Sequence, residues 1–312
     1  MTTTLSEEQL PLYKIPTYTL STNSWGHTLF YSIEEFRAFL IPLFKEPGEY
    51  NISLEISRKF NEIGRNWRIN KYYTEATNGG RDYRTYWDTE KEKNKEGIIF
   101  IDREDTFYLP REYYMWLNFL PIYDKEENDF LFPKVYDTQL HVALYEKLAE
   151  LHYEHAVILK KRQIAMSYYH AAKLINLYWF DKGVTLKLLA SLDSYINEEG
   201  TWMFLTEYRD FLNEHTAWFR PSDPDKVKNW QQKISVEING RKTNKGSKAR
   251  MLGISTQQSA TKGVGGASKL AVFEEAGIAP TMDKSYRYMR PALESGLKTV
   301  GLFVAYGSVR TT

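Results

Sequence analysis

The sequence predicts an α/β fold with a mostly parallel central sheet and helices on both of its faces. From Asp137 onward, short and continuously apolar runs alternate with longer helix-forming stretches. Continuous apolar runs are typical of strands that are buried on both faces, and their alternation with helices is typical of a parallel sheet. A chain of 312 residues with 42% hydrophobic residues is long enough to bury one large core or two smaller ones.

The composition excludes several classes of protein. The net charge of +1 means that no global basic field indicates a nucleic-acid partner, so any such contact must be local. Without cysteine the chain has neither disulfides nor thiolate zinc sites, and it suits a reducing compartment. Neither a signal peptide nor an apolar run long enough to cross a bilayer is present. We therefore expect a soluble, intracellular protein with no membrane partner.

The first part of the chain, residues 1–130, is predicted to be an irregular, aromatic-rich extension. A short helix opens at Ser32 and is interrupted by Pro42. A second helix is expected at 55–73, closed by the Gly79-Gly80 turn. The remaining expectations are a solvated charged loop at 89–97, a buried strand at 97–102 and a dense aromatic segment at 106–123.

The second part, residues 131–312, is predicted to be the α/β domain. Its first helix spans 137–151, with leucines spaced along one face and Asp137 able to cap its start. Its last helix is expected to stop at Gly296. The predicted strands lie at 156–159, 183–191, 236–242, 249–256, 268–277 and 299–308, and the other helices at 167–180 and 198–219.

The segment around Ser167 has the layout of a phosphate-binding loop. An apolar strand, a polar turn and a Ser at a helix start follow one another. In such loops the backbone N–H groups surround a polyphosphate, a lysine neutralises it and the hydroxyl binds magnesium. The usual glycine position holds Ala165, however, and the usual lysine position holds Met166. A buried turn that merely looks like such a loop is the alternative.

A lysine from the strand end is able to replace the missing one. Lys160 and Lys161 stand at the opposite side of the same tight loop, and a long side chain from there reaches the same phosphates. If Ala165 needs a positive φ, its Cβ costs about 1–2 kcal/mol. The loop is completed by Arg162, Gln163 and Ile164.

Two further elements follow buried strands in the right order. Glu274 and Glu275 end an apolar strand, where one carboxylate is suited to hold magnesium and the second to orient the attacking water. Gly307 and Ser308 form a small polar turn after the last strand. Taken singly, each is also explained as an ordinary strand exit with solvated side chains, whereas the joint order favours a nucleotide site.

These segments together resemble the ATPase domain of the large subunit of tailed-phage DNA-packaging terminases, a P-loop NTPase. The resemblance covers roughly Phe130 to the end and rests on four segments, "ILKKRQIAMSYYHAA", "GTWMFLTEYRDFLNEHTAWF", "KGVGGASKLAVFEEAG" and "GLFVAYGS". It implies that Lys160, seven positions before Ser167, is the displaced Walker A lysine, with Lys161 as the fallback. Glu274 and Glu275 then match the Walker B acids, and Gln139 loosely matches an adenine-side glutamine.

The resemblance also implies an activity and partners. ATP and magnesium are the implied cofactors: Ser167 and Glu274 hold the metal, Glu275 polarises water, and a coupling motif at Tyr306, Gly307 and Ser308 senses the γ-phosphate. The partners are double-stranded DNA, a portal protein and a small terminase subunit. A ring of copies at the procapsid portal vertex in the host cytoplasm is expected, with a monomer as the isolated state.

The sequence departs from the family at several positions. Glu274 stands where aspartate is commoner, and Lys262 precedes the Walker B strand where the family often has a trans-acting arginine. Because the chain stops at Thr312, before the position of the family's nuclease domain, we expect no DNA cleavage from it. The rivals are another P-loop nucleic-acid translocase or helicase, and an inactive P-loop scaffold.

Two other groups of residues are weaker candidates. His152 and His155 stand three apart and are a potential metal pair on a helix, but no third ligand has an obvious spacing. A basic turn is either a solvated loop or a contact to the phosphate backbone of DNA; it contains Arg241, Lys242, Lys245, Lys248 and Arg250.

Overall fold

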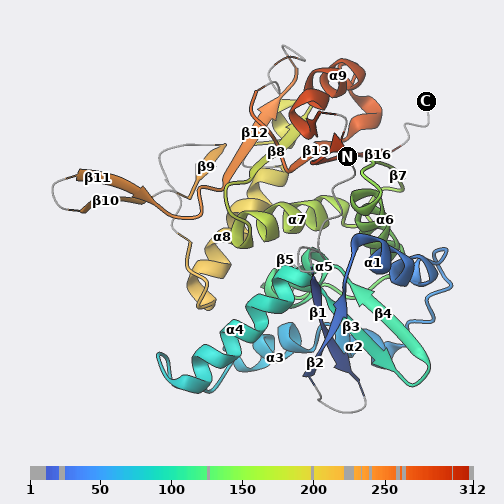
Figure 1. Cartoon of the computed structure of the whole chain (residues 1–312), viewed down its shortest axis with the longest axis vertical. Helices are drawn as coiled ribbons and strands as arrows, with labels where there is room; N and C mark the ends of the chain where they lie inside the picture. The colour runs from blue at the N-terminus through green and yellow to red at the C-terminus, as the bar shows by residue number, and fades with distance from the viewer. Residues whose placement is uncertain are drawn as a thin grey trace, which may run out of the picture.

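The chain folds into two lobes that share a broad contact (Figure 1). The computed structural model describes residues 12–20, 25–124, 127–197, 200–220, 228–232, 234–238, 241–257, 261, 265–296 and 298–308. One lobe holds the N-terminal strands and helices, and the other holds the larger sheet. Among the described helices, none is both long and apolar enough to span a membrane.

The larger sheet confirms the predicted α/β class. Its six strands follow the order β7-β16-β13-β8-β12-β9, and every neighbouring pair is parallel except β9 with β12. The strands are β7 (Ala156–Lys160), β8 (Thr185–Ala190), β9 (Asn229–Gln231), β12 (Arg250–Ser255), β13 (Leu270–Glu274) and β16 (Leu302–Ser308).

Helices cover both faces of this sheet, as the apolar strands predicted. Along β13 and β16, alternate side chains enter two different hydrophobic clusters, because successive residues of a strand point to opposite faces. Val272 and Val304 belong to the cluster that contains the buried side of α7, whereas Phe273 and Phe303 pack with Met289. The first face carries α6 (Asp137–Leu151), α7 (Met166–Phe180) and α8 (Thr201–His215), and the second carries α9 (Met282–Leu293).

The strand order brings distant parts of the sequence to one edge. Because β16 lies between β7 and β13, the carboxyl ends of all three strands meet there, and Lys160 pairs in register with Ser308. Glu274 ends the next strand. Ligands of open parallel sheets bind outside these carboxyl ends. The topology therefore assembles the three predicted elements at the expected edge.

The N-terminal lobe is more regular than the sequence indicated. It contains a four-stranded sheet of order β2-β1-β3-β4 and a small β5-β6 ribbon. Ser32 caps its first helix by accepting a hydrogen bond from the N–H of Glu35, and Pro42 lies in the short 3₁₀ turn 41–43 that follows. The elements are β1 (Tyr13–Thr19), β2 (Trp25–Phe30), α1 (Ile33–Leu40), α2 (Leu54–Phe60), α3 (Glu62–Asn70), α4 (Arg81–Glu96), β3 (Ile98–Asp102), β4 (Asp105–Leu109), α5 (Arg111–Phe119), β5 (Ile122–Asp124) and β6 (Asp129–Leu131).

The predicted solvated loop at 89–97 is wrong. It is the last part of α4, and it ends at Gly97 with a φ of +85°. Lys93 donates to Glu90 at 2.6 Å, and the Tyr114 hydroxyl donates to the same carboxylate at 2.7 Å. Glu90 and Lys93 are therefore paired inside the lobe, whereas Lys95 of the same run is exposed.

Several predicted boundaries also differ from the structure. The stretch 55–73 is divided into α2 and α3 at Asn61, and Gly80 begins α4 instead of closing a helix. Tyr136 is the N-cap of α6, so Asp137 lies in its first turn without capping it. α9 ends at Leu293, before the antiparallel pair of β14 (Glu294–Ser295) and β15 (Lys298–Thr299). The single strand predicted at 236–242 covers parts of two antiparallel strands, β10 (Ile234–Ile238) and β11 (Arg241–Lys245).

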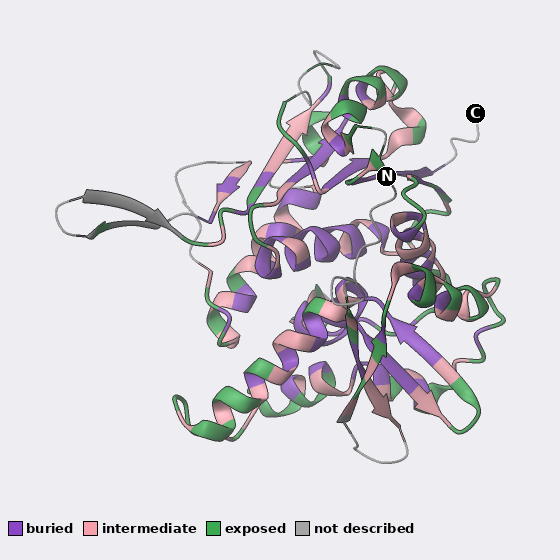
Figure 2. Ribbon diagram, in the orientation of Figure 1, coloured by how far each residue is buried: buried purple, intermediate pink, exposed green. Residues whose placement is uncertain are grey.

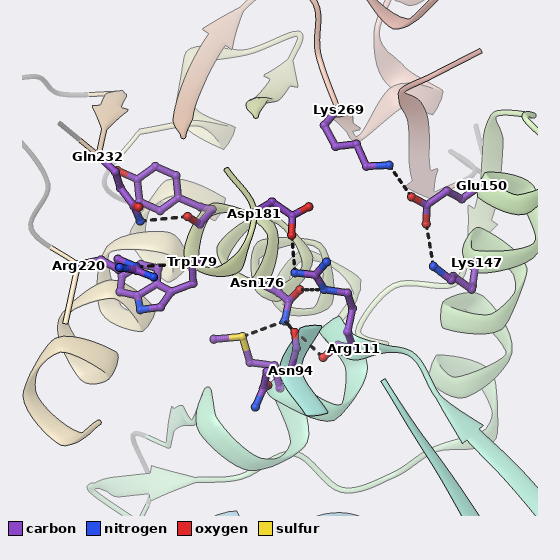
Figure 3. Close-up of polar contacts among 12 residues, drawn as sticks. Asn94, Arg111, Lys147, Glu150, Asn176, Trp179, Asp181, Arg220, Gln232 and Lys269 are labelled. Atoms are coloured by element: carbon purple, nitrogen blue, oxygen red, sulfur yellow. Dashed lines mark hydrogen bonds and ion pairs between the residues drawn. The ribbon is translucent and has the colours of Figure 1, made fainter. Parts of the chain in front are cut away.

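Polar side chains tie the two lobes together. Arg111 of α5 donates to Asn176 of α7 at 2.6 Å and pairs with Asp181 at 2.8 Å (Figure 3). Asn176 in turn donates to the carbonyl of Asn94 at 2.8 Å. One hydrophobic cluster continues from the N-terminal sheet to the larger sheet. The division at residue 130 stays a prediction, and the core is continuous across it.

Candidate nucleotide site

The turn between β7 and α7 combines two left-handed residues with a helix start that no side chain caps. Ala165 has a φ of +58° and a ψ of 24°, and Gln163 has a φ of +63°, so both are left-handed. Ala165 is the N-cap of α7 and its side chain caps nothing. The N–H groups of the first helical turn are consequently available to a ligand. The Cβ of Ala165 imposes the cost of about 1–2 kcal/mol that the sequence indicated.

The first side-chain group of the site surrounds Lys160. Its ammonium nitrogen lies 3.1 Å from Oε1 of Glu275 and 3.4 Å from the Ser308 hydroxyl, and the side chain is only 8% exposed. Glu275 Oε2 accepts a hydrogen bond of 3.3 Å from the N–H of Ser308. A cation and a carboxylate from strands 115 residues apart thus face each other at the carboxyl edge of the sheet.

The second group surrounds Glu274. The Ser167 hydroxyl donates to Oε1 of Glu274 at 2.7 Å, and the Thr201 hydroxyl donates to Oε2. The Tyr306 hydroxyl donates to Ser167 at 3.4 Å. Burial raises the pKa of Glu274, and the hydrogen bonds from Thr201, Ser167 and Tyr306 act in the opposite direction.

This second group has the donor chemistry that magnesium prefers. The carboxylate of Glu274 is 5% exposed, and its hydrogen-bond partners are hydroxyl groups rather than cations. Mg²⁺ is a hard cation that takes oxygen ligands, usually from one or two carboxylates together with substrate phosphates. The Ser167–Glu274 pair therefore fits a magnesium ion.

The backbone at the end of β13 turns Glu275 toward Lys160. Glu275 is itself left-handed, with a φ of +49°, which breaks the alternation of the strand. Gly307 lies close to the turn that follows β13: a Cβ at position 307 would be 2.8 Å from the backbone nitrogen of Gly277 in that turn. Glycine at 307 is thus required for Ser308 to reach Glu275.

The other predicted loop residues have different surroundings. Lys161, Arg162 and Gln163 are exposed, whereas Met166 is buried in the core. Gln139 is buried and donates a hydrogen bond of 3.3 Å to the carbonyl of Ile164. Gln139 therefore contacts the backbone of the loop from α6.

Thr201 is a residue of this site that sequence reasoning missed. It is the first residue of α8 and is 1% exposed. The signal in the sequence is a hydroxyl residue at a predicted helix start after a predicted strand. His170 also supports the site, since its ring stacks on Tyr306 with centroids 4.1 Å apart and its Nε2 lies 2.7 Å from Glu146.

The weaker candidates are not brought together. α6 ends at Leu151, so His152 and His155 do not share a helix, and Nδ1 of His155 accepts from the N–H of Phe303. Within the described ranges, no group of three or more potential metal ligands occurs. Lys248 and Arg250 are exposed. Lys262 and the side chains of Arg241, Lys242 and Lys245 lie outside the described residues.

Comparisons with known proteins give only distant structural matches. No family model and no curated protein matches the chain. The large terminase ATPase domain of Thermus phage P74-26 is similar at 13% identity with a TM-score of 0.38, covering 51% of this chain and 60% of that one. An arginine-to-alanine mutant of that domain is similar at 14% identity with a TM-score of 0.39, covering 50% of this chain and 60% of that one. The Phi-28 gp11 DNA packaging motor is similar at 15% identity with a TM-score of 0.28, covering 48% of this chain and 45% of that one. The chain thus spans about 60% of the length of the terminase structures.

Proposed function

We propose that this chain binds magnesium and ATP at the carboxyl edge of its sheet and hydrolyses ATP to move double-stranded DNA into a viral procapsid. The observation that carries the ATPase is the convergence of Lys160 with Glu275 and Ser308, next to the Ser167–Glu274 pair. The packaging role is supported by the motif resemblance between Phe130 and the end of the chain.

The residues of the site divide the work between binding and chemistry. The N–H groups around Ala165 and the ammonium of Lys160 bind the phosphates. Ser167 and Glu274 would hold the magnesium ion, which supplies charge neutralisation at the transferred phosphate. To reach the phosphates, Lys160 has to leave Glu275, and this frees a carboxylate that accepts a proton from water.

The partner of Glu275 on β16 links the site to the last strand. Once Lys160 has moved, the N–H of Ser308 still holds Oε2 of Glu275 and keeps that carboxylate oriented. In the proposed motor this contact senses the γ-phosphate and transmits its loss. A portal protein, a small terminase subunit and a ring of copies at the portal vertex in the host cytoplasm complete the proposal.

The substitution Glu275→Gln tests the chemical role. It keeps the shape and the hydrogen bond from Ser308 but removes the base, so hydrolysis with enzyme in excess is expected to fall by about 10²–10⁴-fold. The rise in melting temperature with ATP and magnesium is expected to stay at the parental level. Equal loss of nucleotide binding in this variant would contradict the assigned role.

An inactive scaffold is the rival that particular observations favour. Ala165 retains a strained backbone, and Lys160 is already neutralised by Glu275. A scaffold predicts a flat melting temperature across ATP and its analogues with magnesium, because a ligand that does not bind the native state cannot stabilise it. A nucleotide-dependent rise in melting temperature excludes the scaffold.

A helicase is the other rival, and it predicts DNA unwinding by the purified chain.

A further inference from the structure

A groove in the N-terminal lobe carries charges that the proposed ATPase does not use. It has a volume of about 500 Å³ and lies between α2, α3 and the segment 131–136 that leads into α6. Four basic side chains line it, Arg58, Arg65, Arg68 and Lys134, with Glu127 as the lining carboxylate.

Three of these cations lack an ion-pair partner among the residues that the structure describes. Arg68 pairs with Glu127 and lies 3.4 Å from Asp129. Arg58, Arg65 and Lys134 are exposed and form no ion pair within the described part of the chain. Four cations against the two carboxylates leave an excess of two positive charges, whereas the whole chain has a net charge of +1. A concentration of charge of one sign in a concave surface attracts an anionic partner.

The frame that holds these cations is rigid. Asn61 lies where α2 meets α3, and its side-chain amide donates at 2.9 Å to the carbonyl of Pro133, next to Lys134. Gly64 packs so closely on Phe132 that a Cβ would lie 2.4 Å from that ring. Arg58, Arg65 and Lys134 therefore project from three segments that are fixed to one another.

We propose that this groove binds the phosphate backbone of double-stranded DNA. Guanidinium groups donate paired hydrogen bonds to phosphate oxygens, and such contacts are independent of base sequence, as translocation along DNA requires. The choice of duplex DNA among polyanions rests on the proposed function, whereas the anionic character of the ligand rests on the groove itself.

The test compares two variants with the same change in charge. Arg58→Gln, Arg65→Gln and Lys134→Gln are combined in one, and Lys14→Gln, Lys182→Gln and Lys284→Gln, three exposed lysines elsewhere, in the other. Affinity of the full chain for a fluorescent 20-base-pair duplex is measured without nucleotide at several salt concentrations. The groove variant is expected to lose roughly tenfold or more at low salt, and its slope of log K against log salt is expected to fall by about three. The control variant is expected to stay within about threefold, since its lysines neutralise no phosphate in the complex.

Two results overturn the proposal. Equal losses in both variants show a general effect of charge, and parental affinity in the groove variant leaves an acidic protein segment as the groove's partner. The melting temperature of each variant without ligand verifies the fold. ATP with magnesium is expected to raise the melting temperature of the groove variant as in the parent. A different outcome separates the two proposals. If the groove variant loses affinity for DNA but ATP with magnesium does not raise the melting temperature even of the parent, only the proposed ATPase is contradicted.

Discussion

At the scale of single residues, Ala165 shows the conflict between function and local preference. Its left-handed backbone is favourable for glycine and unfavourable for a residue with a Cβ. Ala165→Gly is expected to stabilise the chain by about 0.5–1 kcal/mol, because relief of strain exceeds the added freedom of the unfolded chain. Chemical denaturation measures this. The contrasting variant is Ala171→Gly inside α7, which is expected to destabilise the chain by about 1 kcal/mol. If Ala165→Gly also lowers the stability, the strain assigned to Ala165 is contradicted.

The two lysines at the end of β7 differ in their surroundings. Lys160 contacts Glu275 and Ser308, while Lys161 is exposed. Lys160→Ala is therefore expected to abolish the rise in melting temperature that ATP and magnesium produce, and Lys161→Ala to retain most of it. The reverse pattern identifies Lys161 as the phosphate lysine.

The sequence predicted the site residues at strand ends and Ser167 at the start of α7, but it missed Thr201, which reaches the site from the start of α8. Lys160, Glu274, Glu275 and Ser308 all stand at strand ends, where a parallel sheet collects them. The hydrogen bond from Thr201 depends on where α8 begins relative to β13, which no local pattern specifies. The side on which Lys160 enters likewise follows from the strand order.

At the scale of elements, a buried charged cluster joins three helices behind the site. Lys173 of α7 lies 2.6 Å from Glu146 of α6 and 3.3 Å from Glu112 of α5, and His170 also contacts Glu146. Burial alone would raise the pKa of Glu146, but Lys173 and His170 lower it to about 2. The ion pairs thus favour the charged carboxylate in the folded state.

Stability at acid pH tests this cluster. A carboxyl group with a lowered folded pKa stabilises the fold above its unfolded pKa and loses that contribution as the pH falls from about 4.5 to about 2. Glu146→Gln is expected to cost about 3 kcal/mol at neutral pH and to flatten the loss over this range. Urea unfolding at several pH values measures both. The exposed Glu104→Gln is the control, and an equal acid response in parent and Glu146 variant contradicts the account.

Elements were predicted well where the local sequence pattern determines them, and poorly where contacts with residues distant in the sequence determine them. The continuous apolar runs predicted strands at 156–159, 268–277 and 299–308, where the structure has β7, β13 and β16, although Val157 and Leu159 on one face of β7 are exposed. The charged run at 89–97 is helical and partly buried because Tyr114 and Glu90 meet across α4 and α5. The parallel pairing of β1 with β3 joins segments about 80 residues apart, which composition does not reveal.

At the scale of the whole molecule, the two lobes share one hydrophobic core. The exposed residues lie mainly on the outer helices and loops, while α5 and α7 are buried between the lobes (Figure 2). Trp116 of α5 donates to the Tyr208 hydroxyl of α8 at 3.1 Å. Polar groups of both lobes are therefore satisfied only when they are packed together.

A shared core predicts a single unfolding transition. Calorimetric and van't Hoff enthalpies are expected to agree, and fluorescence and far-UV circular dichroism to change together. Arg111→Ala is expected to lower stability by about 3 kcal/mol because it leaves Asp181 without its ion-pair partner at the junction. Two separate transitions in the parent chain would show that the lobes fold independently.

The most direct measurement of the central claim is a structure of the chain with magnesium and a non-hydrolysable ATP analogue. We predict that the Lys160 ammonium leaves Glu275 and contacts phosphate oxygens, with Ser167 and Glu274 next to the metal and Glu275 facing the γ-phosphate. A nucleotide bound elsewhere, with Lys160 still paired to Glu275, would contradict the account.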